Sequence, residues 1–221
     1  MSEVKKQDKD LAKPIKKKPE KSWVYSVVLP VARVLLKTIL PVKYHGLENV
    51  SDLKAPYILM ANHTSMLDPF MMAAAIPQYQ IRFIGKKELW KFPPFAWFAN
   101  NINAIPVDRH NTDMEAMRAC MRVTREGHVL GIFPEGTRHH KGLMTELESG
   151  VAMIALRSRV PLVPVYIAGK LGLFRTLHVY VGKPIDMDDL REMGINTETC
   201  GMLLGRISQT YAALDAARPE A

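Results

Sequence analysis

The chain has 221 residues, of which 30 are Lys or Arg and 22 are Asp or Glu, so its formal net charge is +8. The content of 48% apolar and 24% charged residues is typical of a globular protein and excludes a disordered or fibrous one. Two cysteines, Cys120 and Cys200, cannot form a disulfide scaffold or a cysteine-built zinc site, which favours a reducing, cytosolic setting. The length suits a single domain with a short appendage.

The first 22 residues form a basic segment with few apolar side chains. They carry eight Lys and four Asp or Glu, a net charge of +4 that is half of the charge of the whole chain. Such a segment cannot bury enough apolar surface to fold, so we expect residues 1–22 to be a disordered basic tail. The tail is either a solubilising extension or a binder of anionic surfaces.

The next segment, residues 23–42, is apolar but is interrupted by Pro30, Arg33 and Lys37. A central proline and two charges make a membrane span costly. On a helix the two cations share one face while apolar residues cover the others, a pattern typical of a helix that lies in a membrane interface. We expect peripheral attachment here; the alternative is a helix packed on the core of the protein.

From residue 43 to the end, apolar runs of strand type alternate with segments of helical type. Strands are expected at residues 42–48, 56–62, 81–85, 103–107, 128–133, 162–167 and 177–182. Helices are expected at residues 66–76, 93–100, 112–126, 148–159 and 196–217. This alternation predicts a layered α/β domain over 43–221, with a mostly parallel or mixed sheet flanked by helices.

A histidine and an aspartate lie at the junction of the second expected strand with the helix after it. His63 and Asp68 are five residues apart, which on one continuous helix would point their side chains about 140° apart. They can meet only if His63 lies in the turn before the helix and Asp68 lies in its first turns. In that arrangement the carboxylate holds one ring nitrogen and the other accepts a proton, as in a general-base dyad. A solvated histidine beside a capping aspartate is the alternative.

Basic residues follow three of the expected strands. The loop 131–142 contains Gly136 and Arg138, and a guanidinium fork next to a glycine that allows close backbone approach suits a phosphate. Lys86 and Arg109 lie at comparable strand ends. In an α/β domain these ends meet at the ligand-binding edge, so the three cations predict an anionic ligand.

Several other kinds of site are excluded because the sequence lacks their motifs. The His139–His140 pair has no carboxylate at metal-ligand spacing, and we expect no metal. Neither a G-x-S-x-G elbow nor a glycine-rich nucleotide loop is present. Beyond residue 22 the chain is only mildly basic and lacks interleaved aromatic and basic residues, so no nucleic-acid partner is expected.

Taken in order, five short blocks resemble those of the PlsC-type glycerolipid acyltransferases, best known as 1-acyl-sn-glycerol-3-phosphate acyltransferases. The blocks are N-H-T-S-M-L-D (62–68), F-I-G-K-K-E-L (83–89), I-P-V-D-R (105–109), F-P-E-G-T-R (133–138) and V-P-L-V-P-V (160–165). The resemblance covers roughly residues 42–185, with the motifs within about 57–170. The five blocks in this order are specific for the family, although each block alone is not. One departure is the acidic Glu148 before Ser149 and Gly150, where family members often carry a basic residue.

The resemblance implies a role for each matching residue. His63 and Asp68 would be catalytic, and the block around Pro161 would help to shape the acyl side of the site. The residues implied to hold the phosphorylated acceptor are Lys86, Arg109, Glu135, Gly136 and Arg138.

The activity implied is transfer of a fatty acyl group from acyl-CoA or acyl carrier protein to 1-acyl-sn-glycerol 3-phosphate, giving phosphatidic acid for phospholipid synthesis. It requires no metal or cofactor beyond that co-substrate. The expected partners are the membrane phospholipid surface, lysophosphatidate and the acyl donor, with the enzyme peripheral or monotopic at the cytoplasmic face. The alternatives are acylation of glycerol 3-phosphate or another lysolipid, and a non-catalytic basic membrane-binding protein.

Overall fold

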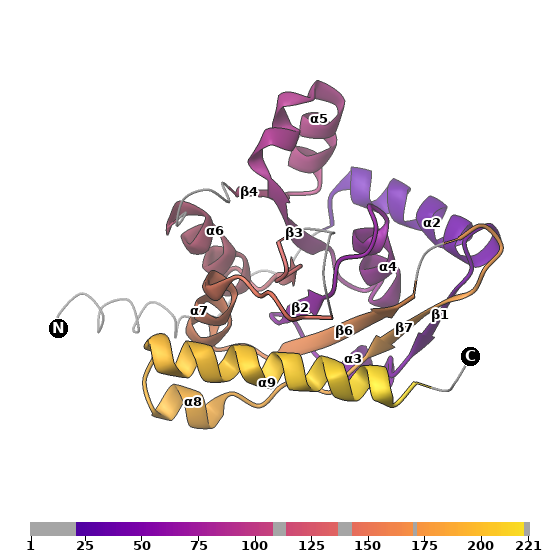
Figure 1. Ribbon diagram of the computed structural model, residues 1–221. Helices are drawn as coiled ribbons and strands as arrows, with labels where there is room; N and C mark the ends of the chain where they lie inside the picture. The colour runs from indigo at the N-terminus through magenta and orange to yellow at the C-terminus, as the bar shows by residue number, and fades with distance from the viewer. Residues whose placement is uncertain (1–20, 108–113, 137–142, 170–171, 219–221) are drawn as a thin grey trace.

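The computed structural model describes residues 21–107, 114–136, 143–169 and 172–218. A single sheet of seven strands, in the order β1-β7-β6-β2-β5-β3-β4, forms the middle layer (Figure 1). The strands are β1 (Val42–His45), β2 (Ile58–Ala61), β3 (Ile81–Lys86), β4 (Ile105–Val107), β5 (Val129–Ile132), β6 (Leu162–Ala168) and β7 (Leu177–Val181). The expected basic tail at 1–22 falls almost wholly outside the described residues.

The sheet is mixed, as the sequence predicts. Five strands run parallel to one another: β6, β2, β5, β3 and β4. Strand β7 is antiparallel to β6, and β1 is parallel to β7. The carboxyl ends of the five parallel strands therefore meet at one edge, where α/β domains place their ligands.

Helices cover both faces of the sheet (Figure 1). They are α2 (Trp23–Thr38), α3 (Glu48–Ser51), α4 (Asp68–Ala75), α5 (Pro93–Asn101), α6 (Met114–Arg125), α7 (Ser149–Ser158), α8 (Asp188–Glu192) and α9 (Thr197–Ala216), with a 3-10 helix η1 (Lys87–Lys91) before α5. The seven expected strands and the helices after residue 43 are confirmed, whereas α3, η1 and α8 were not predicted.

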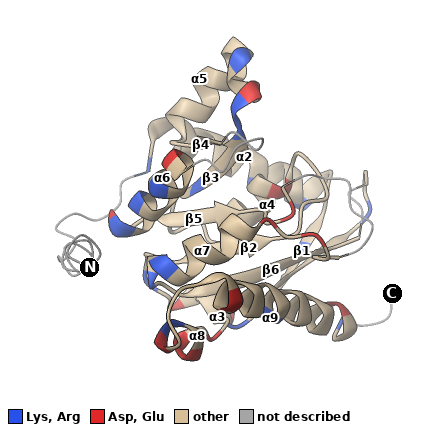
Figure 2. Ribbon diagram, turned by 60° about the vertical axis from the view of Figure 1, so that its left-hand side comes forward, with Lys and Arg blue, Asp and Glu red and all other residues tan. Residues whose placement is uncertain are grey.

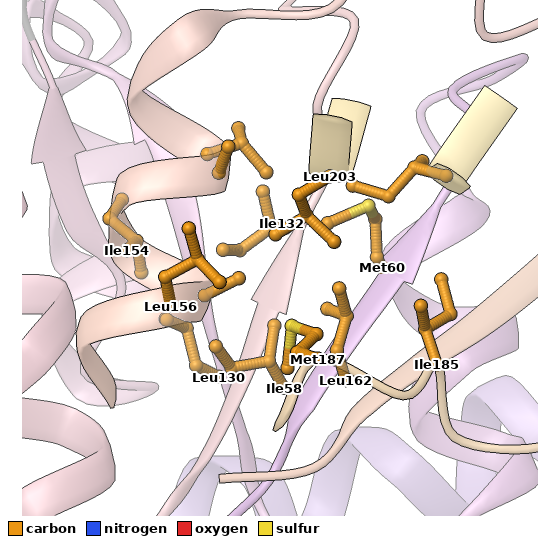
Figure 3. Packing of buried hydrophobic residues seen from close by; sticks show 14 of the residues in the cluster. Ile58, Met60, Leu130, Ile132, Ile154, Leu156, Leu162, Ile185, Met187 and Leu203 are labelled. Carbon is orange, nitrogen blue, oxygen red and sulfur yellow. The ribbon is translucent and has the colours of Figure 1, made fainter. Parts of the chain in front are cut away.

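Strand β2 shows why the core has two halves. Its four residues are all buried, and successive side chains point to opposite faces. Ile58 and Met60 pack into the core below α7 and α9, whereas Leu59 and Ala61 pack into the core below α2 and α4. Figure 3 shows the first half, in which side chains of β2, β5 and β6 meet those of α7 and α9. A short apolar run buried on both faces is the pattern expected of a central strand in a three-layer fold.

Helix α2 contributes to the core and also carries an exposed apolar stripe. Val24, Tyr25, Leu29 and Leu36 are buried, and α2 packs against α4 and α5. The opposite side exposes four large apolar residues, Trp23, Val27, Val31 and Val34, each more than half accessible. Thus the predicted helix exists and its buried side packs on the core, whereas contact of its exposed side with a membrane stays a prediction.

The helix ends at Thr38, short of the expected residue 42. Pro41 disfavours helical backbone at the residue before it, which explains the early end. No helix in the described ranges combines the length and apolarity needed to cross a bilayer.

Candidate active site

The turn between β2 and α4 holds the site, and Asn62 fixes its start. The Asn62 side-chain amide donates to the Ile167 carbonyl at 2.9 Å, and its oxygen accepts the Ile167 N–H at 2.7 Å. Asn62 is buried just past the end of β2. Its two side-chain bonds to Ile167 take the place of the strand-to-strand backbone hydrogen bonds, which stop where β2 ends. The chain is thereby held against β6 immediately before His63.

His63 and Asp68 meet in the arrangement that their spacing requires. His63 lies in the turn and Asp68 is the first residue of α4, followed by Pro69, which is tolerated in a first helical turn. His63 Nδ1 lies 2.8 Å from Asp68 Oδ2. The Asp68 side chain is fully buried, whereas that of His63 is 16% exposed. The carboxylate therefore fixes the ring from the protein side.

Asp68 is held in turn by the residues between it and His63. Its Oδ2 accepts the backbone N–H groups of Thr64 at 2.6 Å and Ser65 at 2.8 Å. Its Oδ1 accepts the hydroxyls of Ser65 at 2.7 Å and Thr64 at 3.2 Å. The turn thus wraps around one carboxylate.

These contacts set the charge of Asp68. Burial alone raises the pKa of the Asp68 carboxyl, but hydrogen bonds from His63, Ser65 and Thr64 outweigh it and hold this pKa below the ordinary value of 3.8. The group is therefore a carboxylate at neutral pH. A carboxylate on Nδ1 fixes the ring tautomer and stabilises the imidazolium that forms when Nε2 takes a proton.

The end of β5 supports the histidine from the other side. The ring of Phe133 stacks on that of His63 with 4.2 Å between centroids, and Phe83 stacks on Phe133 at 6.1 Å. Glu135 is buried; its Oε2 accepts the His63 N–H at 3.0 Å and its Oε1 accepts the Met144 N–H at 3.0 Å. These contacts give Glu135 a part in fixing the backbone of His63, and its implied role toward the acceptor stays a prediction.

Two of the expected anion-binding residues lie at the same edge. Gly136 follows Glu135 with φ of 68°, and a Cβ there would come within 2.9 Å of Glu148 Oε1, so both backbone and space favour glycine. Lys86 ends β3 with a 43% exposed side chain, and its Nζ lies 3.8 Å from Glu88 Oε1. Arg109 and Arg138 fall outside the described residues.

A cavity of about 870 Å³ opens beside His63, in the upper part of the range of about 300–1,000 Å³ for ligand pockets. Its walls are mostly apolar and come from α2, α4, α5, α6 and α7. His63, Lys86 and Gly136 line it together with side chains that include Tyr25, Leu29, Met66, Phe70, Phe95, Phe98, Met117, Cys120, Phe133 and Ile154. A long apolar group can thus lie within reach of the histidine.

Some features of the site differ from, or go beyond, the sequence analysis. The block around Pro161 becomes part of β6 in the middle of the sheet, and none of its residues lines the cavity, so it does not form the acyl side. Asn62 and Phe133 were not singled out, although both stand at the carboxyl end of a buried strand, which is the signal that could have found them. No group of three or more His, Cys, Asp and Glu within the described ranges is placed to hold a metal.

A histidine held by a buried aspartate beside an apolar cavity, at the carboxyl edge of an α/β sheet, is an arrangement that suits a general base acting on an apolar substrate. A sequence model of the acyltransferase family matches residues 41–168. The chain belongs to this family of enzymes.

Relatives of known name agree with this family. The chain is 32% identical over 178 residues to the 1-acyl-sn-glycerol-3-phosphate acyltransferase of Streptococcus pneumoniae, a match that covers 78% of this chain and 65% of that protein. It is 27% identical over 175 residues to the enzyme of the same name from Bacillus subtilis, covering 77% of this chain and 86% of that one. The match thus spans just under two thirds of the first relative and most of the second.

A solved structure has the same fold. It is the crystal structure of the 1-acyl-sn-glycerophosphate acyltransferase of Thermotoga maritima, with a TM-score of 0.66 at 23% identity, and the match covers 89% of this chain and 81% of that one. This likeness confirms the layered α/β architecture.

Proposed function

We propose that the protein transfers a fatty acyl group from an acyl thioester to the free hydroxyl of 1-acyl-sn-glycerol 3-phosphate, giving phosphatidic acid. The observation that carries this proposal is the His63–Asp68 pair at 2.8 Å, facing an apolar cavity of about 870 Å³. The names of the relatives from Streptococcus pneumoniae and Bacillus subtilis support the same acceptor.

The chemistry follows from the dyad. Nε2 of His63 takes the proton of the acceptor hydroxyl while the hydroxyl oxygen attacks the thioester carbonyl. The C–S bond then breaks, and the imidazolium returns its proton to the departing thiolate. Asp68 stays ionised throughout and holds Nδ1–H, so the positive charge on the ring is compensated when it forms. A positioned base of this kind typically contributes about 10²–10⁴-fold to the rate.

Acceptor binding is assigned to the cationic edge of the cavity. Lys86 and the backbone around Gly136 lie at this edge, and Arg109 and Arg138 belong to the segments that directly follow β4 and the Gly136 turn in the chain. Their charges would hold the phosphate of the acceptor and leave its acyl chain in the apolar cavity. Binding energy from the phosphate is then used to orient the hydroxyl at His63.

The membrane surface is the proposed place of action, since both acceptor and product are lipids. The exposed stripe of α2 continues to α5, where Trp97 packs edge-on against Trp23. Trp97 and Phe92, the residue before α5, are each more than half exposed. Aromatic and branched apolar side chains of this kind insert at a bilayer interface. The lysines of residues 1–22 would add a salt-sensitive attraction to anionic lipid, and the cytoplasmic face follows from the cytosolic setting of the donors.

The test is a panel of acceptors supplied to the purified full-length protein with palmitoyl-CoA and with palmitoyl-acyl carrier protein. We expect product with 1-acyl-sn-glycerol 3-phosphate and much less with glycerol 3-phosphate or lysophosphatidylcholine. Faster acylation of either of the last two would move the assignment to that acceptor. No acylation of any of the three by a folded preparation would overturn the enzyme assignment.

A further inference from the structure

Helix α9 is connected to the backbone around His63 although it lies outside the cavity. The helix is described over its whole length, and none of its residues lines the cavity. It packs on β6 and α7, and between Arg206 and Asp215 it carries no charged side chain (Figure 2). In this stretch its contacts with the rest of the protein are therefore made by apolar side chains and neutral hydroxyls.

One of these hydroxyls reaches the strand that leads to His63. Tyr211 is fully buried, and its hydroxyl donates to the Met60 carbonyl and accepts the Val165 N–H at 3.3 Å. Burial raises the pKa of this hydroxyl well above its ordinary value of 10.0, so it keeps its proton and donates at neutral pH. Tyr211 thus holds β2 to β6 at a point three residues before His63.

A second hydroxyl of α9 reaches His63 through a chain of hydrogen bonds. Ser208 Oγ donates to the Met144 carbonyl at 2.8 Å. The Met144 N–H donates at 3.0 Å to Oε1 of Glu135, and Oε2 of the same carboxylate accepts the His63 N–H at 3.0 Å. Two residues of the segment between β5 and α7 therefore connect Ser208 to the backbone of His63.

The backbone of Met144 shows that this connection holds a conformation that needs support. Its φ is 53°, in the left-handed region that residues other than glycine rarely adopt, and its side chain is fully buried. Such a conformation persists only where the surroundings fix it. Here the N–H of Met144 is bonded to Glu135 and its carbonyl to Ser208. Without the Ser208 hydroxyl, Met144 can relax toward ordinary backbone, and Glu135 can move with it.

We propose that Ser208 and Tyr211 are positioning residues, which hold the backbone of His63 in place beside the cavity. They act through Glu135 and Met60 and do not line the space for the substrates. The proposal rests on the acyl transfer proposed above, because it concerns the base of that reaction. Both residues lie beyond residue 168, where the match to the family model ends, so the motifs of the family give them no role.

The test removes both hydroxyls in the double variant Ser208→Ala with Tyr211→Phe and measures kcat and KM with palmitoyl-CoA and 1-acyl-sn-glycerol 3-phosphate. A displaced base slows the chemical step, and since a displacement of about 1 Å can cost about 10²-fold, we expect kcat to fall about tenfold or more. Both KM values should stay within about twofold of wild type, because binding of the substrates is unchanged. Ser208→Thr returns a hydroxyl to its position and should recover most of the kcat lost in Ser208→Ala.

Thr210→Val is the matched control for the loss of a hydroxyl. Thr210 is half-buried on the same helix, and its hydroxyl donates to the Arg206 carbonyl at 2.8 Å, within α9. We expect its kcat within about twofold of wild type. Circular dichroism verifies folding, and the single variants Ser208→Ala and Tyr211→Phe replace the double variant if that one does not fold.

A double-mutant cycle tests the connection through Glu135. Glu135→Gln leaves one acceptor oxygen where the carboxylate has two, so it interrupts the chain between Met144 and His63. In this background we expect Ser208→Ala to lower kcat by less than about twofold, because residues that act through one network are not additive. The same loss in both backgrounds would overturn the proposed connection.

The backbone amide of His63 tests the positioning without turnover. In nuclear magnetic resonance spectra we expect its resonance to shift in Ser208→Ala and to stay in place in Thr210→Val. The positioning proposal would be overturned by an unmoved His63 amide, by a folded double variant with the kcat of wild type, by raised KM values at unchanged kcat, or by an equal loss in Thr210→Val. A shifted amide in a protein that acylates no acceptor would contradict the proposed function instead and leave the positioning of His63 standing.

Discussion

Asp68 determines the geometry of the site because so many groups depend on it. A single buried carboxylate accepts the His63 ring, two backbone N–H groups and two hydroxyls. Hydrogen bonds to a charged group contribute about 1.5–3 kcal/mol each, and a buried donor without a partner is costly. The turn from residue 62 to 68 is therefore stable only around an ionised aspartate.

The lowered pKa of Asp68 makes the free energy of unfolding depend on pH. The contribution of this group is complete above its ordinary pKa of 3.8 and is lost as pH falls toward the lower pKa of the folded state. Asp68→Asn removes the charge, so we expect it to lower the free energy of unfolding by about 1.5–3 kcal/mol at pH 7. The difference from wild type should shrink at about pH 3. Urea unfolding at both pH values measures it.

A suitable control for this experiment is Asp52→Asn, because Asp52 is exposed on the surface after α3. It should leave the free energy of unfolding within about 0.5 kcal/mol of wild type at either pH. An Asp68→Asn variant as stable as wild type at pH 7, or equally destabilised at both pH values, would show that the carboxylate does not hold the turn.

Gly131, in the middle of β5, leaves room for the aromatic side chains that pack against His63. A Cβ at Gly131 would come within 2.5 Å of the Phe83 ring and 2.7 Å of Ile81. Phe83 stacks on Phe133, and Phe133 stacks on His63. Close packing between strands therefore extends without interruption from Gly131 to the proposed base.

Gly131→Ala tests this packing. Overpacking of a core costs about 1–3 kcal/mol, so we expect that loss in the free energy of unfolding, together with a reduced transfer rate as Phe83 and Phe133 shift. Denaturant unfolding and the transfer assay provide the two measurements. The matched control is Gly205→Ala in α9, where a Cβ meets nothing within 4 Å; it should stabilise the protein by about 0.4–1 kcal/mol. Equal stability of the two variants would contradict the packing argument.

Helix α2 shows how far periodicity predicts a structure. The sequence predicts an amphipathic helix from residue 23, and the structure has it, with its exposed stripe at four-residue spacing through Trp23, Val27 and Val31. Periodicity could not predict that the other side would be buried against α4, since that contact joins segments that are distant in sequence. An apolar pattern on more than one side of a helix is compatible with both a lipid surface and a protein core.

The stripe of α2 should bind membranes by apolar burial, which salt does not screen. Replacing Val27 and Val31 by Ser removes about 1.5–3 kcal/mol of burial at each position, so vesicle partitioning should fall at least tenfold even in high salt. Co-sedimentation with vesicles measures this. Met202→Ser is the control, because Met202 is an exposed apolar residue on α9. If both variants sediment with vesicles as wild type does, the stripe does not contact the bilayer.

Across the whole molecule, local patterns predicted the helices and strands and the meeting of His63 with Asp68, but not the arrangement of the elements in the sheet. The strands from β1 to β7 are recognisable because apolar and β-branched residues are local signals. The sheet order and the reversal of β7 and β1 depend on pairing between distant segments. The spacing of His63 and Asp68 defined the only geometry in which they could meet. The bonds of Asn62 to Ile167 join residues 105 positions apart and had no local signal.

We infer that His63, oriented by Asp68, is the base in acyl transfer. The most direct measurement is the single-turnover rate of the full-length protein and its His63→Ala variant with saturating palmitoyl-CoA and 1-acyl-sn-glycerol 3-phosphate. We predict a rate at least 10²-fold lower for the variant, with its circular dichroism spectrum unchanged and its acceptor bound as tightly as by wild type. A folded His63→Ala protein that turns over at a rate close to that of wild type would contradict this role of His63.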